Sequence, residues 1–129
     1  MSGGELSGTD SARLKEAVHR AETLSGLKFS LFLGDAEGDP RRHAQQLHAR
    51  LEDPADSVLV LCDPGQRALE IVTGVEARRT LTDGECRMAA ASMQSNFIAG
   101  DLVGGLTHGL AQLGGYARKA RVLHVTENS

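Results

Sequence analysis

The chain has 129 residues, of which 40% are apolar and 3% aromatic, and its formal net charge at pH 7 is −3. This length is typical of one domain with a single core, which must be built from aliphatic side chains. The negative charge argues against nucleic-acid binding, and the scarcity of aromatic residues argues against stacking on single-stranded bases. The sequence shows neither a membrane-spanning segment nor a secretory leader, so we expect a soluble cytoplasmic protein.

The N-terminal half predicts a helix, a strand and a second helix. Residues 1–8 are rich in glycine and serine and are expected to be disordered. An apolar stripe with helical spacing and a β-friendly run follow. Asp39 and Pro40 have the residue types of an N-cap and a first helical position. The three elements are expected over residues 10–25, 28–33 and 40–51.

A hairpin is predicted in the middle of the chain. Residues 57–62 contain a continuous apolar run, which is typical of a central strand covered on both faces. Pro64 and Gly65 then match the middle of a type II turn. The chain should return as an antiparallel strand over residues 68–73.

Two further helices complete the prediction. Residues 82–85 (TDGE) match a capping box that opens a helix, and Gly100 should end it. Asp101 is expected to cap the last helix. Residues 121–126 alternate weakly and predict a short edge strand in a C-terminal tail, 120–129, that follows a single domain over residues 9–119.

The predicted order is therefore α-β-α-β-β-α-α. A helix connects the first two strands, which must then be parallel and joined by a right-handed crossover. The expected fold is an α/β domain with a mixed sheet and helices on both faces.

The glycine-rich segment at residues 100–109 does not match a nucleotide-binding loop, because its spacing is wrong and it follows a helix. Close packing of this helix against the small residues 89–92 (AAAS) explains the glycines better. The histidines lack the spacing of a zinc site. Cys62 and Cys86 are expected to be buried thiols, although their spacing leaves a disulfide open.

Acidic residues gather at one predicted edge of the sheet. Asp35 follows the first strand and Asp63 follows the second, and parallel strands place both at the same edge, where ligands of open α/β sheets bind. Asp39 and Asp101 are further candidates. No cofactor is predicted, and Ca²⁺ is the cation that such a site would suit. Asp and Gly are also ordinary turn residues, so a purely structural role is the alternative.

Arg41 and Arg42 lie in the first turn of the second helix, whose N-terminus favours anions. They are candidates for binding an anionic ligand. The alternative, which we favour, is that the arginines pair internally with Asp35, Glu37 or Asp39.

Three stretches resemble the TPM-domain superfamily, and most nearly an actinobacterial branch of unknown function. They are residues 25–35 (SGLKFSLFLGD), 58–74 (VLVLCDPGQRALEIVTG) and 97–106 (FIAGDLVGGL). The resemblance covers about residues 13–114 and implies an α/β sandwich of the order given above. Some TPM proteins are credited with calcium binding or acid-phosphatase activity, but none of the three stretches is a catalytic signature.

Because no nucleophile, base or cofactor loop is assembled, we expect a non-enzymatic binding or accessory module. The alternative is a metal-assisted, phosphatase-like hydrolase with its site at the acidic edge. A protein partner of unknown identity fits the first hypothesis, and the chain is expected to be a monomer or a weak homo-oligomer.

Overall fold

The computed structural model describes the backbone of residues 6–127 and the side chains of residues 6–119. Its helices and strands follow the predicted order. They are α1 (Gly8–Ser25), β1 (Lys28–Leu33), α2 (Pro40–Ala49), β2 (Ser57–Asp63), β3 (Ala68–Thr73), α3 (Asp83–Ile98) and α4 (Leu102–Glu127). Three short 3-10 helices lie in the connections: η1 (Pro54–Asp56), η2 (Pro64–Gln66) and η3 (Ala77–Arg79).

The strands form one mixed sheet in the order β1-β2-β3. β1 and β2 are parallel, with Leu33 opposite Cys62, and β2 and β3 are antiparallel, with Asp63 opposite Ala68. The predicted α/β fold with a mixed sheet is therefore confirmed. β2 is the central strand and is buried along its whole length, as its apolar run predicts.

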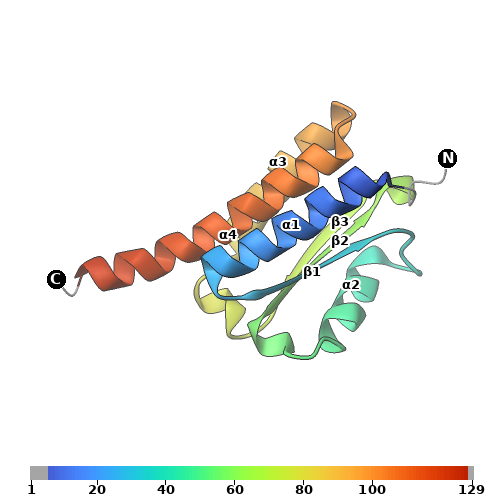
Figure 1. Ribbon diagram of the computed structural model, residues 1–129. Helices are drawn as coiled ribbons and strands as arrows, with labels where there is room; N and C mark the ends of the chain where they lie inside the picture. The colour runs from blue at the N-terminus through green and yellow to red at the C-terminus, as the bar shows by residue number, and fades with distance from the viewer. Residues whose placement is uncertain (1–5, 128–129) are drawn as a thin grey trace.

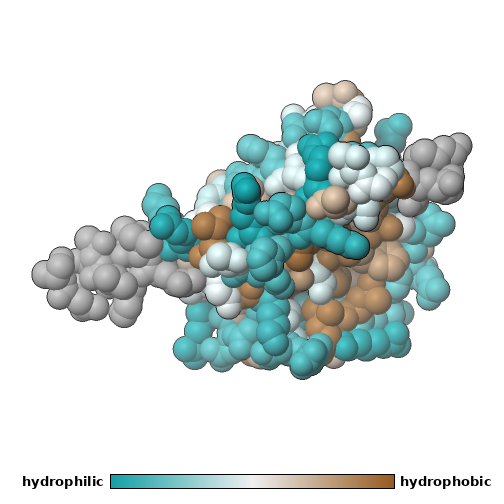
Figure 2. Space-filling model, in the orientation of Figure 1, coloured by the Kyte–Doolittle hydropathy of each residue, from teal (hydrophilic) through white to brown (hydrophobic). Residues whose placement is uncertain are grey.

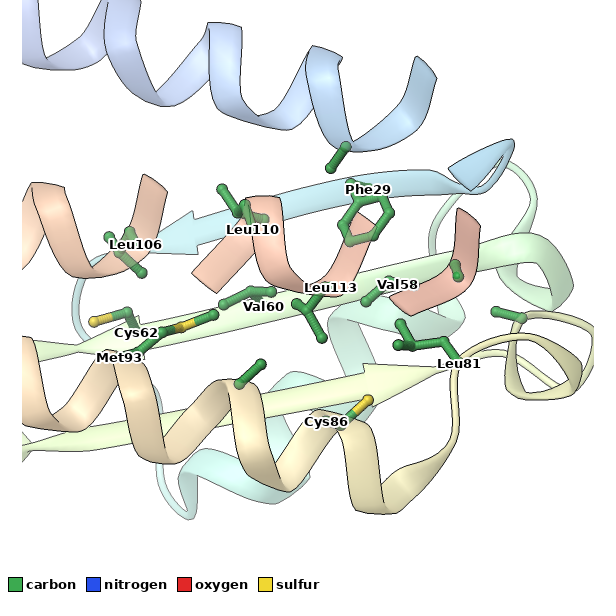
Figure 3. Close-up of a cluster of buried hydrophobic side chains, with 14 of the residues drawn as sticks. Phe29, Val58, Val60, Cys62, Leu81, Cys86, Met93, Leu106, Leu110 and Leu113 are labelled. Carbon is green, nitrogen blue, oxygen red and sulfur yellow. The ribbon is translucent and has the colours of Figure 1, made fainter. Parts of the chain in front are cut away.

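Helices cover the two faces of the sheet unequally. Figure 1 shows α2 on one side of the sheet, and α1, α4 and α3 on the other. The smaller core joins Ala44 of α2 to Leu59 and Leu61 of β2. The larger core lies on the opposite face, and Figure 3 shows its side chains from the sheet, α3 and α4, among them Val58, Val60, Met93, Leu106, Leu110 and Leu113. Alternate residues of β2 thus supply both cores.

Local capping starts the helices where the sequence predicts. Asp39 accepts a hydrogen bond from the Arg42 N–H (3.0 Å) at the start of α2. Thr82 and Glu85 form the predicted capping box of α3. Asp101 accepts a hydrogen bond from the Gly104 N–H (2.9 Å) and caps α4. Each cap satisfies an amide that the helix leaves without a partner.

α4 packs against both α1 and α3 (Figure 1), and its glycines Gly105, Gly109 and Gly114 face these neighbours. A Cβ on Gly105 would lie 2.8 Å from Phe97, and one on Gly109 would overlap Met93. The expected close approach of α4 to α3 is confirmed, but the glycines make room for large side chains of α3 rather than for residues 89–92. On the other side, a Cβ on Gly114 would lie 3.0 Å from the Cα of Ala21 in α1.

The connection between β2 and β3 differs from the predicted type II turn. Residues Pro64–Gln66 form the 3-10 turn η2, and the positive φ falls on Arg67 (54°) instead of Gly65. The physical reason is that the Asp63 carboxylate accepts a hydrogen bond from the Gln66 N–H (3.2 Å) and caps this turn. Arg67 is therefore held in the left-handed region, which L-residues other than Asn and Asp adopt at a cost.

Both predictions for the chain ends need correction. Residues 121–126 do not form an edge strand, because α4 continues to Glu127. A helix that has started extends at little cost, and no glycine or proline follows Gly115. At the other end, Ser7 caps α1 by accepting a hydrogen bond from the Asp10 N–H (3.0 Å), so Gly8 is helical where the sequence predicts disorder. The rest of that prediction, for residues 1–5, lies outside the described residues.

Within residues 6–127, no helix combines the length and the apolar character that crossing a bilayer would need.

Candidate functional site

The carboxyl ends of β1 and β2 lie side by side, as their parallel pairing requires. The Gly34 N–H donates to the Cys62 carbonyl (3.0 Å) and extends the ladder by one step beyond β1. Asp35 and Asp63 follow directly, so both lie at the same edge of the sheet. The predicted placement of the two aspartates at one edge is therefore confirmed.

Asp63 is the buried polar group at this edge, with 1% of its surface exposed. Its Oδ2 accepts hydrogen bonds from the Ala36 N–H (2.8 Å) and from the Gln66 Nε2 (2.6 Å), and its Oδ1 accepts one from the Gln66 N–H (3.2 Å). These donors, the Ala36 amide first among them, lower the pKa of Asp63 below its ordinary value of 3.8, although burial opposes the shift. The carboxylate stays ionised and joins the loop after β1 to the hairpin.

Replacing Asp63 with Asn should lower the melting temperature at pH 7 by several degrees, because the amide nitrogen cannot accept the hydrogen bonds that Oδ1 or Oδ2 now accepts. Thermal unfolding followed by circular dichroism from pH 2 to 7 checks this. Because the folded pKa is lowered, the stabilisation is complete above about pH 3.8 and is lost as the pH falls through the lower folded value.

The difference between wild type and Asp63→Asn should therefore shrink in acid. The matched control is Asp35→Asn, at an exposed aspartate of the same edge, which should leave the melting temperature unchanged. A difference for Asp63→Asn that stays constant down to pH 2 would contradict the assignment.

The other acidic candidates do not join Asp63 in one cluster. Asp39 caps α2, Asp101 caps α4, and Asp35 is exposed. Among the residues that the structure describes, no three His, Cys, Asp or Glu side chains lie together as a metal site would need. The sequence correctly predicts that Asp35 and Asp63 share an edge. The carboxylates of Asp39 and Asp101, however, cap two different helices.

The arginines do not neutralise this edge. Arg41 donates to the Ile71 carbonyl (2.9 Å) and pairs with Glu70 (3.4 Å), so the expected pairing with Asp35, Glu37 or Asp39 is wrong for Arg41. The reason is that α2 packs across β2 and β3, which directs Arg41 to the far strand. Arg42 is exposed, and none of the ion pairs found within residues 6–119 includes it.

A pocket of about 590 Å³ opens beside Asp63, between the end of the β2–β3 hairpin and the α3–α4 turn. Leu69, Phe97, Ile98 and Leu102 supply apolar surface, and Arg67 is the only cationic side chain of the lining. Ile98, at the rim of the pocket, is 87% exposed. No motif in the sequence predicts this site, and the one local signal is the apolar pair Phe97-Ile98 just before the helix-ending Gly100.

The two cysteines are unpaired and buried, as expected. Burial raises the pKa of the Cys62 thiol to about 11, and the negative charge of Asp63 adds to the shift. Burial likewise raises the pKa of Cys86 to about 11. Both are neutral thiols at physiological pH, so Cys62 contributes apolar surface to the pocket and not a thiolate.

Comparison with known proteins gives a family and no activity. A family model described as a domain of unknown function, DUF5130, matches residues 5–113. Two uncharacterised proteins of Mycobacterium tuberculosis, from strains H37Rv and CDC 1551, are each 28% identical over 97 residues, which is 75% of this chain and 58% of theirs. The chain therefore spans less than two thirds of the length of these relatives.

Solved structures from other bacterial proteins share this fold. The BA42 protein of Bizionia argentinensis superposes with a TM-score of 0.79 at 18% identity, covering 89% of this chain and 83% of that one. The N-terminal domain of the cg2496 protein of Corynebacterium glutamicum gives 0.72 at 17% identity, covering 88% and 75%. At such identities the likeness concerns the fold alone.

Proposed function

The chain belongs to DUF5130, a family of domains of unknown function, and from the site at its sheet edge we propose that it is a non-enzymatic binding module. The state of Asp63 supports this best: the carboxylate is buried, and both oxygens accept hydrogen bonds from the protein itself. A carboxylate occupied in this way joins two segments and has little capacity to attack or deprotonate a substrate. The neutral thiol of Cys62 offers no alternative nucleophile.

The pocket beside Asp63 suits an apolar group that ends in a negative charge. Its volume is within the range of small-molecule sites, about 300–1,000 Å³. Leu69, Phe97 and Leu102 provide the apolar walls, and Arg67 provides a cation. Arg67 takes part in none of the ion pairs formed among residues 6–119, so its charge is available to a ligand.

Titration of ¹⁵N-labelled protein with octanoate, followed by NMR, tests this proposal. We expect shifts concentrated at residues 62–69 and 97–102. Arg67→Gln should weaken octanoate binding about threefold, because an exposed ion pair contributes up to about 1 kcal/mol. Octanol, which has the same chain without the charge, is the matched control and should bind both proteins equally. Shifts spread over the whole surface, or an Arg67→Gln variant that binds octanoate as wild type does, would contradict the proposal.

A metal-assisted, phosphatase-like hydrolase is the competing function. Its support is the exposed Asp35, which lies at the same sheet edge as Asp63, the edge where α/β domains bind ligands. Calorimetric titration with Ca²⁺ and Mg²⁺, together with p-nitrophenyl phosphate as substrate, discriminates between the two. A binding module should give no turnover above the buffer control. Metal-dependent turnover that disappears in Asp35→Ala would favour the hydrolase.

We further propose that the chain belongs to an actinobacterial branch of the TPM-domain superfamily. The three stretches quoted above support it, and the element order agrees with what the resemblance implies. A cytoplasmic location and a protein partner also belong to the proposal, and fractionation of cells that express the protein would test the location.

A further inference from the structure

β1 is an edge strand, and alternate residues direct their backbone groups away from β2. The hydrogen bond from the Gly34 N–H to the Cys62 carbonyl shows that the backbone groups of the even-numbered residues point towards β2. The backbone N–H and C=O groups of Phe29, Leu31 and Leu33 therefore point to the open side. The Phe29 N–H is bonded there by the Glu22 carboxylate (3.0 Å), whereas the N–H groups of Leu31 and Leu33 have no partner within the described part of the chain.

The open side of β1 borders a groove of about 530 Å³ between α1 and the strand. Leu14 and Val18 line it from α1, and Leu31 and Leu33 line it from β1. Figure 2 shows hydrophobic side chains gathered on this face, in the space between α1 and α2 where Figure 1 shows β1. Apolar surface beside unpaired backbone groups is what an added strand would cover.

The opposite edge of the sheet is protected, which singles out β1. The Gly74 N–H donates to the Ser57 carbonyl (2.9 Å). The backbone groups of the even-numbered residues of β3 therefore point towards β2, and those of Ile71 point outward. Arg41 donates to that outward Ile71 carbonyl (2.9 Å) and blocks the edge with a charged side chain. Nothing comparable covers Leu31 among the contacts of residues 6–119.

We propose that β1 pairs antiparallel with β1 of a second copy of this chain, about a twofold axis at Leu31. In that register Leu31 faces Leu31 of the partner subunit, and Phe29 faces Leu33 of the partner subunit. The outward groups of Leu31 then bond to their counterparts, and the Leu33 N–H of each copy donates to the Phe29 carbonyl of the other. The Phe29 N–H exchanges its bond to Glu22 for one to the Leu33 carbonyl of the partner subunit, which frees the Glu22 carboxylate, and the two sheets become continuous.

Charges on α1 favour a second copy over another partner. α1 runs antiparallel to β1 (Figure 1), and Lys15 and Glu22, which are about two helical turns apart, both line the groove. A twofold axis at the middle of the groove brings Lys15 of one copy towards Glu22 of the partner subunit, and the reverse. The surface is thus complementary to itself, which an isologous dimer requires. The Arg67 pocket plays no part in this contact.

Sedimentation velocity and amide hydrogen exchange, both from low micromolar to millimolar protein, test the proposal on the unmodified chain. The mass should rise with concentration towards twice that of the chain. Protection should rise in step at Leu31 and Leu33, while Ser30 and Phe32, whose amides face β2, serve as internal controls. A mass that stays monomeric, or association without added protection at Leu31 and Leu33, would overturn it.

A cross-link provides the second measurement. Residues opposite each other in a hydrogen-bonded antiparallel pair have Cα atoms about 5.5 Å apart, within the span of a disulfide. Leu31→Cys should therefore form a disulfide-linked dimer under mild oxidation. Ser30→Cys is the matched control, because its counterpart in the partner subunit lies opposite Phe32, and it should stay monomeric on a non-reducing gel. Equal cross-linking of both variants would exclude the register.

Discussion

Replacing Gly74 with alanine is expected to destabilise the protein by on the order of 4 kcal/mol, at the severe end of single substitutions. Gly74 is buried directly after β3, and its N–H donates to the Ser57 carbonyl (2.9 Å). An added Cβ would overlap the carbonyl oxygens of Pro54 and Ala55 and lie 2.6 Å from the carbonyl carbon of Ala55. These are backbone atoms of η1, so no side chain can rotate to relieve the overlap.

Thermal unfolding measures this effect, which corresponds to a melting temperature lower by about 15 °C for a domain of this size. Gly84→Ala is the matched control: the nearest atom to its added Cβ is the end of the Arg87 side chain at 3.8 Å, an ordinary contact. That variant should be neutral or slightly more stable. If Gly74→Ala melted like Gly84→Ala, the close packing of the chain after β3 against η1 would be wrong.

Gly109→Leu should be the second most damaging change, at about 3 kcal/mol. Gly109 is buried in α4, and a Cβ there would overlap Met93. Met93 is itself fully buried between the sheet and α4 (Figure 3), so its side chain has no free space to enter. Gly105→Leu should act in the same direction through Phe97.

Gly115→Leu is the control for this prediction, because it puts the same side chain on the same helix where nothing lies within 4 Å. Its exposed position should gain up to about 1 kcal/mol from the better helix propensity of leucine. Urea unfolding of the three variants measures the differences. Equal midpoints for Gly109→Leu and Gly115→Leu would mean that Met93 repacks without cost.

Features that depend on neighbours in the sequence could be predicted closely. β1 and β3 have the predicted bounds, and the caps at Asp39, Thr82 and Asp101 form as expected. The parallel pairing of β1 and β2 follows from the helical crossover, and with it the shared edge of Asp35 and Asp63. Each of these inferences needs only residue types, spacing and the rules of strand connection.

Features that depend on distant contacts could not be predicted. The turn at Pro64–Gln66 is a 3-10 turn because Asp63 caps it, and the same carboxylate is held by Ala36, 27 residues earlier. The pocket combines the tip of the hairpin with the turn between α3 and α4, so no single stretch of sequence contains its chemistry. The partner of Arg41 could not be predicted for the same reason, since the carbonyl to which it donates is on β3.

The packing of α4 against α1 has a consequence for synthesis on the ribosome. Ala21 of α1 is covered by α4, where Gly114 brings the two helices into close contact. The whole sheet, α2 and α3 are translated between these two helices. The apolar stripe of α1 therefore leaves the exit tunnel long before the surface that buries it. During that interval α1 and the unpaired edge of β1 expose adjoining apolar surface, which makes the incomplete chain the form most prone to aggregate.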